Sequence, residues 1–287
     1  MPDTTTNVSH SSFLTDLNSV VMACGVIRVY AGEGSTRRGV LRLCSCLKQL
    51  LEDKLYNIQT VMPAELIKGG WEEGTVLLIF GGGYDQGYQQ ALGTVGMDRV
   101  RQYVQEGGSY LGLCAGGYFG SEFVEFDKGG PLEVCGERYL KFFPVKLKWL
   151  PTGCNDRENH DPESSISRHR CRKITTLGQK DSNIQTVCYY NGGGYFVSSD
   201  TSDPERCTPL ASYEEHPDKP PAIVLCRCQT GTAILTGVHL EFAADDLHLD
   251  LEKENQRIIA HDLKLGEQLR KEMFREVLQL LGLVVDT

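Results

Sequence analysis

Cys114 is the residue whose neighbours in the sequence most clearly predict a chemical role, because it is set among glycines. It follows an apolar run, 110–113, that predicts a strand, and it forms a G-x-C-x-G pattern with Gly112 and Gly116. This spacing is typical of a nucleophile on a sharp strand-to-helix turn, where small residues let the neighbouring backbone pass close by. The N-terminal N–H groups of the following helix favour the reactive thiolate. The pattern therefore predicts a nucleophilic thiol above the edge of a sheet.

A histidine and a glutamate two residues apart, His239 and Glu241, follow a second strand-like run at 232–236. With Cys114 they predict a Cys–His–Glu arrangement in which the thiol attacks an acyl carbon and His239 takes and returns the proton. Glu241 would hold the imidazole in its productive tautomer. Taken singly, these residues could equally be a buried thiol, a packing histidine and a solvated glutamate. Their order along the chain favours the catalytic interpretation.

Backbone donors for an oxyanion are expected on both sides of the thiol. The N–H of Ala115 directly follows the nucleophile, and Gly82 or Gly83 would supply a second donor where a predicted strand ends. Asp85 would either contact a substrate amine or cap the next segment. Asn191 begins a glycine-rich stretch, 191–194, that lines the cleft or forms a turn between strands.

The elements that position these residues alternate between strands and helices in the first half of the chain. Strands are expected at 20–31, 56–62, 75–80 and up to residue 114, with helices at 36–53, 63–67 and 98–105. This alternation predicts an α/β fold with a flavodoxin-like, doubly wound and mostly parallel sheet. Active sites in such sheets lie beyond the carboxyl ends of the strands, where Cys114 and the glycines at 81–83 would fall.

The second half is richer in strands. They are predicted at 122–126 and 139–149 and in a hairpin made by 222–228 and 232–236, and one long helix spans 252–281. The polar stretch at about 151–172 is predicted to be a surface insertion, and the basic run 168–173 a solvated loop. Residues 1–18 are predicted to be a disordered tail and 19–287 a single domain.

Composition narrows the class of protein further. A net charge of −9 argues against a nucleic-acid partner. The first twenty residues lack a secretory signal, and no apolar run is long enough to span a membrane. The eleven cysteines form no zinc-ligand spacing, so neither a metal nor a cofactor is predicted, and a reducing, cytoplasmic location is expected.

The order strand, glycine turn, strand, GLCAGG and HLE resembles the class I glutamine amidotransferases, which use a Cys–His–Glu triad on a flavodoxin-like sheet. That resemblance implies catalytic roles for Cys114, His239 and Glu241. Leu240 occupies a place that is usually proline in those enzymes.

A narrower resemblance is to the amino-terminal domain of eukaryotic biotin–protein ligases. It rests on the segments VYAGEGS, FGGGYDQGY, GGSYLGLCAGGYFGSEFVEF, KFFPV, YYNGGGYF, GVHLEF and LLGLVV. It implies a domain that is accessory or regulatory to protein biotinylation and has no biotin-transfer centre of its own. Its partners would be a biotin ligase catalytic domain or a biotin-accepting carboxylase. The alternatives are an active thiol amidase that takes a small amide substrate, and a redox-sensing thiol.

Overall fold

The computed structural model describes residues 25–52, 54–149, 170–176, 184–197 and 206–286. The predicted tail at 1–18 and nearly all of the predicted insertion at 151–172 lie outside these residues. Residues 170–172 are the exception, because they form the start of a strand, which corrects the solvated loop expected for this part of 168–173.

The first half alternates strands with helices, as expected. Its elements are β1 (Gly25–Tyr30), α1 (Arg37–Leu50), β2 (Tyr56–Val61), α2 (Pro63–Lys68), β3 (Thr75–Phe80), α3 (Asp85–Gln105), β4 (Ser109–Leu113) and α4 (Ala115–Gly120). The helix expected at 98–105 begins much earlier, at Asp85. It is kinked within its length, because Gly93 has a non-helical backbone with a φ of 57°.

The second half holds most of the strands and a helical end. Its elements are β5 (Ser121–Phe126), β6 (Val134–Glu137), β7 (Phe143–Trp149), β8 (Arg170–Thr176), β9 (Gln185–Tyr190), β10 (Gly194–Phe196), β11 (Cys207–Tyr213), β12 (Pro221–Cys228), β13 (Gly231–Thr236), a 3₁₀ turn η2 (Ala244–Asp246), α5 (Glu254–Leu265) and α6 (Glu267–Leu280).

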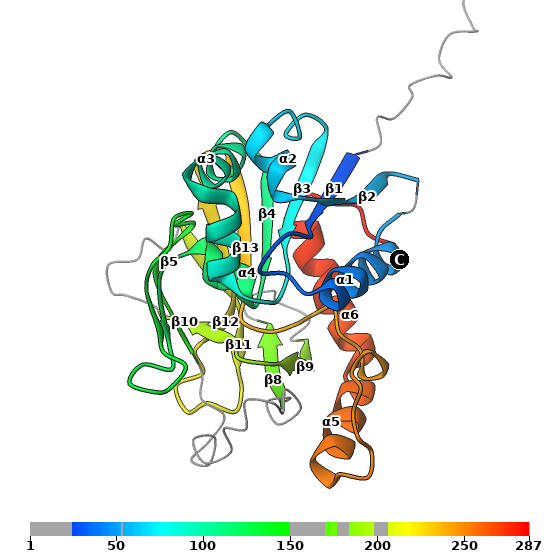
Figure 1. The fold of residues 1–287 in the computed structure, drawn as a ribbon. Helices are drawn as coiled ribbons and strands as arrows, with labels where there is room; N and C mark the ends of the chain where they lie inside the picture. Colours follow the sequence, from blue (N-terminus) through cyan, green and yellow to red (C-terminus); the bar gives the residue numbers. More distant parts are fainter. Residues whose placement is uncertain (1–24, 53, 150–169, 177–183, 198–205, 287) are drawn as a thin grey trace, which may run out of the picture.

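Two sheets organise the described part of the chain (Figure 1). The larger one has nine strands in the order β2-β1-β3-β4-β13-β12-β11-β8-β9. Neighbours from β2 to β13 run parallel, and the strands from β12 onward continue the sheet antiparallel. The smaller sheet has the order β10-β7-β5-β6. The α/β fold is confirmed, and the strand-rich second half is the antiparallel extension together with the smaller sheet.

Helices cover both faces of the parallel strands (Figure 1). On one face, α1 and α6 pack their apolar stripes, including Leu43, Leu47 and Phe274, against the sheet. On the other face, α2, α3 and α4 bury residues such as Leu66 and Phe119. Parallel strands that are apolar on both sides need such double coverage. Their carboxyl ends are therefore fixed between two helical layers.

Two predicted connections differ from the structure. The long helix expected at 252–281 is divided at Gly266, whose carbonyl accepts a hydrogen bond of 2.8 Å from the Thr186 hydroxyl on β9. The glycine stretch 191–194 joins β9 of the larger sheet to β10 of the smaller one, so it is not a turn between paired strands. The hairpin of β12 and β13 is confirmed.

Candidate functional site

Cys114 lies on the strained turn that its spacing predicts. It follows β4 directly and has φ 51° and ψ −103°, a conformation that is costly for a residue with a side chain. A Cβ on Gly112 would overlap the carbonyl of Gly116, and a Cβ on Gly116 would overlap the carbonyl of Phe80. Both glycines are therefore required for the backbone to pass through the turn.

The imidazole of His239 and the carboxylate of Glu241 are in direct contact. His239 Nδ1 lies 2.7 Å from Glu241 Oε1, and both side chains are buried. The second carboxylate oxygen, Oε2, is buried with no hydrogen-bond partner among the described residues. Leu240, in the place usually taken by proline, is buried and leaves this contact intact.

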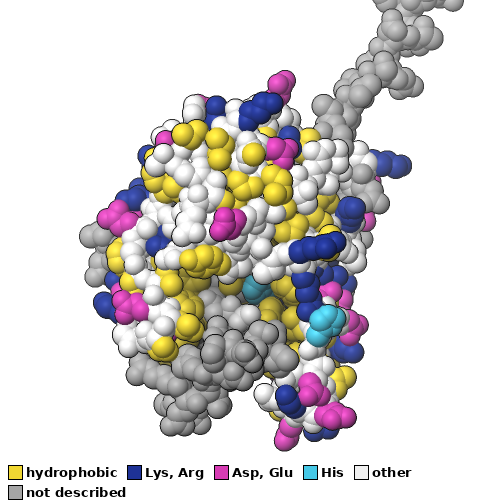
Figure 2. Space-filling view, in the orientation of Figure 1, with side chains coloured by type: hydrophobic (Ala, Val, Ile, Leu, Met, Phe, Trp, Pro, Cys, Tyr) yellow, Lys and Arg dark blue, Asp and Glu magenta, His cyan; other side chains and the backbone are white. Residues whose placement is uncertain are grey.

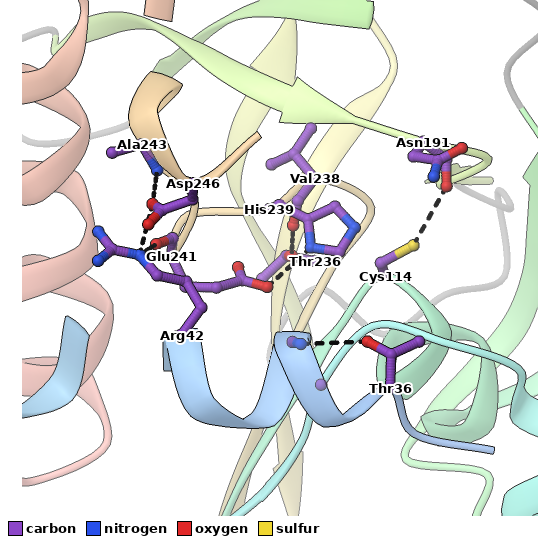
Figure 3. Close-up of polar contacts among 12 residues, drawn as sticks. Thr36, Arg42, Cys114, Asn191, Thr236, Val238, His239, Glu241, Ala243 and Asp246 are labelled. Carbon is purple, nitrogen blue, oxygen red and sulfur yellow. Dashed lines mark hydrogen bonds and ion pairs between the residues drawn. The ribbon is translucent and has the colours of Figure 1, made fainter. Parts of the chain in front are cut away.

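Cys114 and His239 are brought together from the ends of two adjacent parallel strands. β4 and β13 are neighbours in register, so their carboxyl ends place residues 114 and 239 on the same edge. Cys114 is close enough to the imidazole to raise the pKa of His239. The Cys114 sulfur also lies 3.7 Å from the backbone oxygen of Asn191 (Figure 3). Cys114, His239 and Glu241 thus form one continuous group.

The electrostatics of this group keep His239 protonated. Burial by itself lowers the pKa of an imidazole, but the negative charges of Glu241 and Cys114 outweigh it, together with the hydrogen bonds from both. The pKa of His239 rises from 6.5 to about 10 as a result. At neutral pH the ring is an imidazolium beside the sulfur, which suits it to protonate a leaving group.

The glycine turn after β3 lies against the imidazole. A Cβ on Gly82 would overlap Cε1 of His239, with Nε2 only 3.2 Å away, so the ring occupies the space of a missing side chain. The Gly81 carbonyl accepts a hydrogen bond of 3.0 Å from the Gly116 N–H, which ties this turn to α4. Gly83 has φ 150° and pairs with Ser35 as an isolated bridge. Ala115 is the first residue of α4, where backbone N–H groups have no partner within the helix.

Asp85 stands in the first turn of α3 and is buried. Its carboxylate forms an ion pair with the Arg138 guanidinium, whose Nη1 also donates to the carbonyls of Gly136 and Glu137. This pair links α3 to the end of β6, so Asp85 has a structural partner of opposite charge.

Aromatic and basic residues that sequence reasoning missed support the triad. The rings of Tyr189 and Phe242 lie 5.2 Å from the imidazole of His239, and the Tyr189 carbonyl accepts the His239 backbone N–H at 3.0 Å. Arg42 on α1 donates to the Glu241 carbonyl at 3.0 Å and pairs with Asp246 at 2.6 Å (Figure 3). Phe242 directly follows Glu241 in the sequence, so its place near the site could have been predicted. Arg42 is 199 residues away from Glu241, and no local pattern predicts their contact.

Tyrosine hydroxyls fix the glycine stretch that faces the thiol. Tyr118 donates to the Gly192 carbonyl at 3.1 Å, Tyr190 to Gly193 at 2.5 Å and Tyr213 to Gly194 at 2.8 Å. The side chain of Asn191 is hydrogen-bonded to Tyr189. This stretch therefore forms a wall of the site with a defined shape.

The described residues contain neither a metal-ligand cluster nor a membrane-spanning helix. Within them, no group of three or more His, Cys, Asp or Glu side chains is arranged to hold a metal ion. No helix in the described part of the chain is long and apolar enough to cross a membrane.

The fold and the site place the chain in the class of α/β proteins with a glutamine amidotransferase-like fold. A solved glutamine amidotransferase aligns with 90% of this chain and with all of its own chain, at a TM-score of 0.53 and 17% identity. At that identity the likeness concerns the fold alone.

The family follows from sequence comparison. Residues 26–287 match the family model described as "Biotin-protein ligase, N terminal", and the chain belongs to this family. It is similar to a biotin–protein ligase of Schizosaccharomyces pombe, with 33% identity over 90% of this chain, and to an uncharacterized protein of Chlamydia muridarum, with 32% identity over 64% of this chain. The matched region spans 38% of the length of the first relative and 67% of the second.

Proposed function

We propose that this domain is accessory or regulatory to protein biotinylation and does not itself transfer biotin. The family match over 26–287 carries this proposal. The partners would be a biotin ligase catalytic domain or a biotin-accepting carboxylase, in a reducing cytoplasm that keeps the described cysteines as free thiols.

A binding and transfer assay tests this role. The purified domain is mixed with a biotin ligase catalytic domain and, separately, with a biotin-accepting carboxylase, and complex formation and the rate of biotin transfer are measured. We expect a complex with one of them and a changed rate of transfer. If the domain binds neither protein and leaves the rate unchanged, the accessory role is wrong.

We further propose that Cys114 is the nucleophile of an amide-cleaving centre. One observation favours this function: a cysteine on a strained turn lies beside an imidazole that Glu241 holds at 2.7 Å. A buried imidazolium supported in this way is suited to acid–base work on a leaving nitrogen.

The proposed reaction has two steps. The Cys114 sulfur forms a bond to the carboxamide carbon, and the N–H groups of Ala115 and Gly82 or Gly83 receive the oxyanion. The C–N bond then breaks as His239 gives its proton to the nitrogen, which leaves as ammonia or an amine. In the second step His239 takes a proton from water, the water oxygen bonds to the thioester carbon, and the C–S bond breaks to release a carboxylic acid.

Turnover of a carboxamide tests the centre. We expect ammonia release by the wild type that Cys114→Ser abolishes, while Cys135→Ser, a matched change at an exposed thiol on β6, leaves it intact. Ammonia release by folded Cys114→Ser at the wild-type rate would exclude this cysteine as the nucleophile.

A further inference from the structure

Most charged side chains around the Cys114 centre have a partner of opposite charge. Glu241 is in contact with His239, and Asp85 is paired with Arg138. Arg42, the arginine of α1 that reaches behind the triad, is paired with Asp246. Ion pairing thus accounts for each of these charges.

Arg38 differs from these residues. It lies in the first turn of α1, its side chain is exposed, and no ion pair joins it to another residue in the described part of the chain. The first turn of α1 also contains no acidic residue. An arginine in this state carries a full positive charge and a planar set of donors that fits a carboxylate.

The fold holds the start of α1 beside the reactive group. Ser35, just before the helix, forms a bridge with Gly83, and the Tyr84 N–H donates to the Gly34 carbonyl at 2.7 Å. The same glycine turn presents Gly82 to the imidazole of His239. The glycine turn therefore contacts both the imidazole of His239 and the segment that leads into α1.

The charge of Arg38 reaches the aromatic wall of the site. Burial raises the pKa of the Tyr189 hydroxyl and the positive charge of Arg38 lowers it, and the Tyr189 ring lies 5.2 Å from the His239 imidazole. Figure 2 shows a hollow on this face in which a histidine side chain is visible, with Lys and Arg side chains along one border. Basic side chains therefore lie on the same face of the molecule as this histidine.

We propose that Arg38 selects substrates for the Cys114 centre, and that they are carboxamides that carry a negative charge beside the amide. This inference rests on the proposed amide-cleaving function and adds the chemical class of its substrate. The guanidinium would bind the anionic group and leave the carboxamide carbon at the sulfur. Arg38 would therefore act in binding, while Cys114 and His239 carry the bond changes.

Two alkylating probes that differ only in charge test the proposal without requiring turnover. Iodoacetate is anionic and iodoacetamide is neutral, and with both the Cys114 sulfur forms a bond to carbon as iodide leaves. The rates at Cys114 are measured by peptide mass spectrometry, and their ratio reports the local preference for a negative charge.

We expect Arg38→Gln to lower the ratio of iodoacetate to iodoacetamide rates roughly fivefold, as for one unpaired charge a short distance away near the surface. Arg38→Lys should keep most of the ratio, and Lys48→Gln, the same loss of charge in the last turn of α1, should keep all of it. Added salt should lower the ratio in the wild type and much less in Arg38→Gln.

The outcomes separate this proposal from the function on which it rests. An unchanged ratio in Arg38→Gln, or alkylation by neither probe, would overturn it. A ratio that depends on Arg38 in a protein that releases no ammonia would support the charge selection and contradict the amidase function. Turnover of neutral carboxamides, together with a ratio of rates that Arg38→Gln leaves unchanged, would support the amidase function and contradict the charge selection.

Discussion

Gly82 has no side chain, and the imidazole of His239 fills the space where a Cβ would lie. Gly82→Ala should therefore displace this ring, because the new methyl group overlaps Cε1 while the backbone of the turn is held by the Gly81–Gly116 hydrogen bond. The ring has to retreat by roughly 1 Å, and a displacement of that size in a catalytic group costs on the order of 10²-fold in rate. Alanine keeps the backbone N–H, so a loss would report on the imidazole and not on an oxyanion donor.

The matched control is Gly81→Ala. A Cβ at Gly81 meets only Leu43 Cδ2, at 3.7 Å, which is an ordinary van der Waals contact. Neither glycine has the positive φ that would make alanine strained. The assay is the rate at which an electrophilic glutamine analogue modifies Cys114, with thermal unfolding measured alongside. Equal reactivity of the two folded variants would refute the idea that the position of His239 governs the thiol.

Three other predictions follow from the same geometry. Glu241→Gln removes a charge that raises the pKa of His239, and it should slow modification of Cys114 by about 10²–10⁴-fold. Labelling of Cys114 followed over time measures this rate, and a rate equal to that of the wild type would show that the carboxylate is dispensable. Because the folded pKa of His239 is raised, its contribution to the free energy of unfolding is complete below about pH 6.5 and is lost as the pH rises through about 10. In urea unfolding the wild type should thus lose more stability over this range than His239→Gln, and parallel profiles would contradict the raised pKa. Gly116→Ala should destabilise the fold by about 3 kcal/mol or more through overlap with the Phe80 carbonyl, and an unchanged melting temperature would show that the turn can relax.

Local patterns in the sequence predict much of the fold and the central residues of the site. The strand at 75–80, the helix of α1 and the turn at Cys114 follow from apolar periodicity and glycine spacing, because each depends on neighbours within a few residues. The placement of His239 next to Cys114 follows from the rule that active sites gather at the carboxyl ends of parallel strands.

Other features depend on contacts that no local pattern encodes. The break at Gly266 coincides with a hydrogen bond from Thr186, which is 80 residues away in the sequence. The stretch 191–194 has the composition of a hairpin turn, yet its flanking strands pair in different sheets. The pairing of Asp85 with Arg138 likewise depends on the smaller sheet, whose position local patterns do not define.

The most direct test of a triad-activated thiol is the chemical state of one sulfur after exposure to an electrophilic glutamine analogue. Peptide mass spectrometry of the wild type and of His239→Ala, each confirmed as folded, shows where and how fast the label attaches. We expect the label on Cys114 in the wild type and a much slower reaction in His239→Ala. A folded wild type without label on Cys114, or equal labelling in both proteins, would contradict a nucleophile activated by His239 and Glu241.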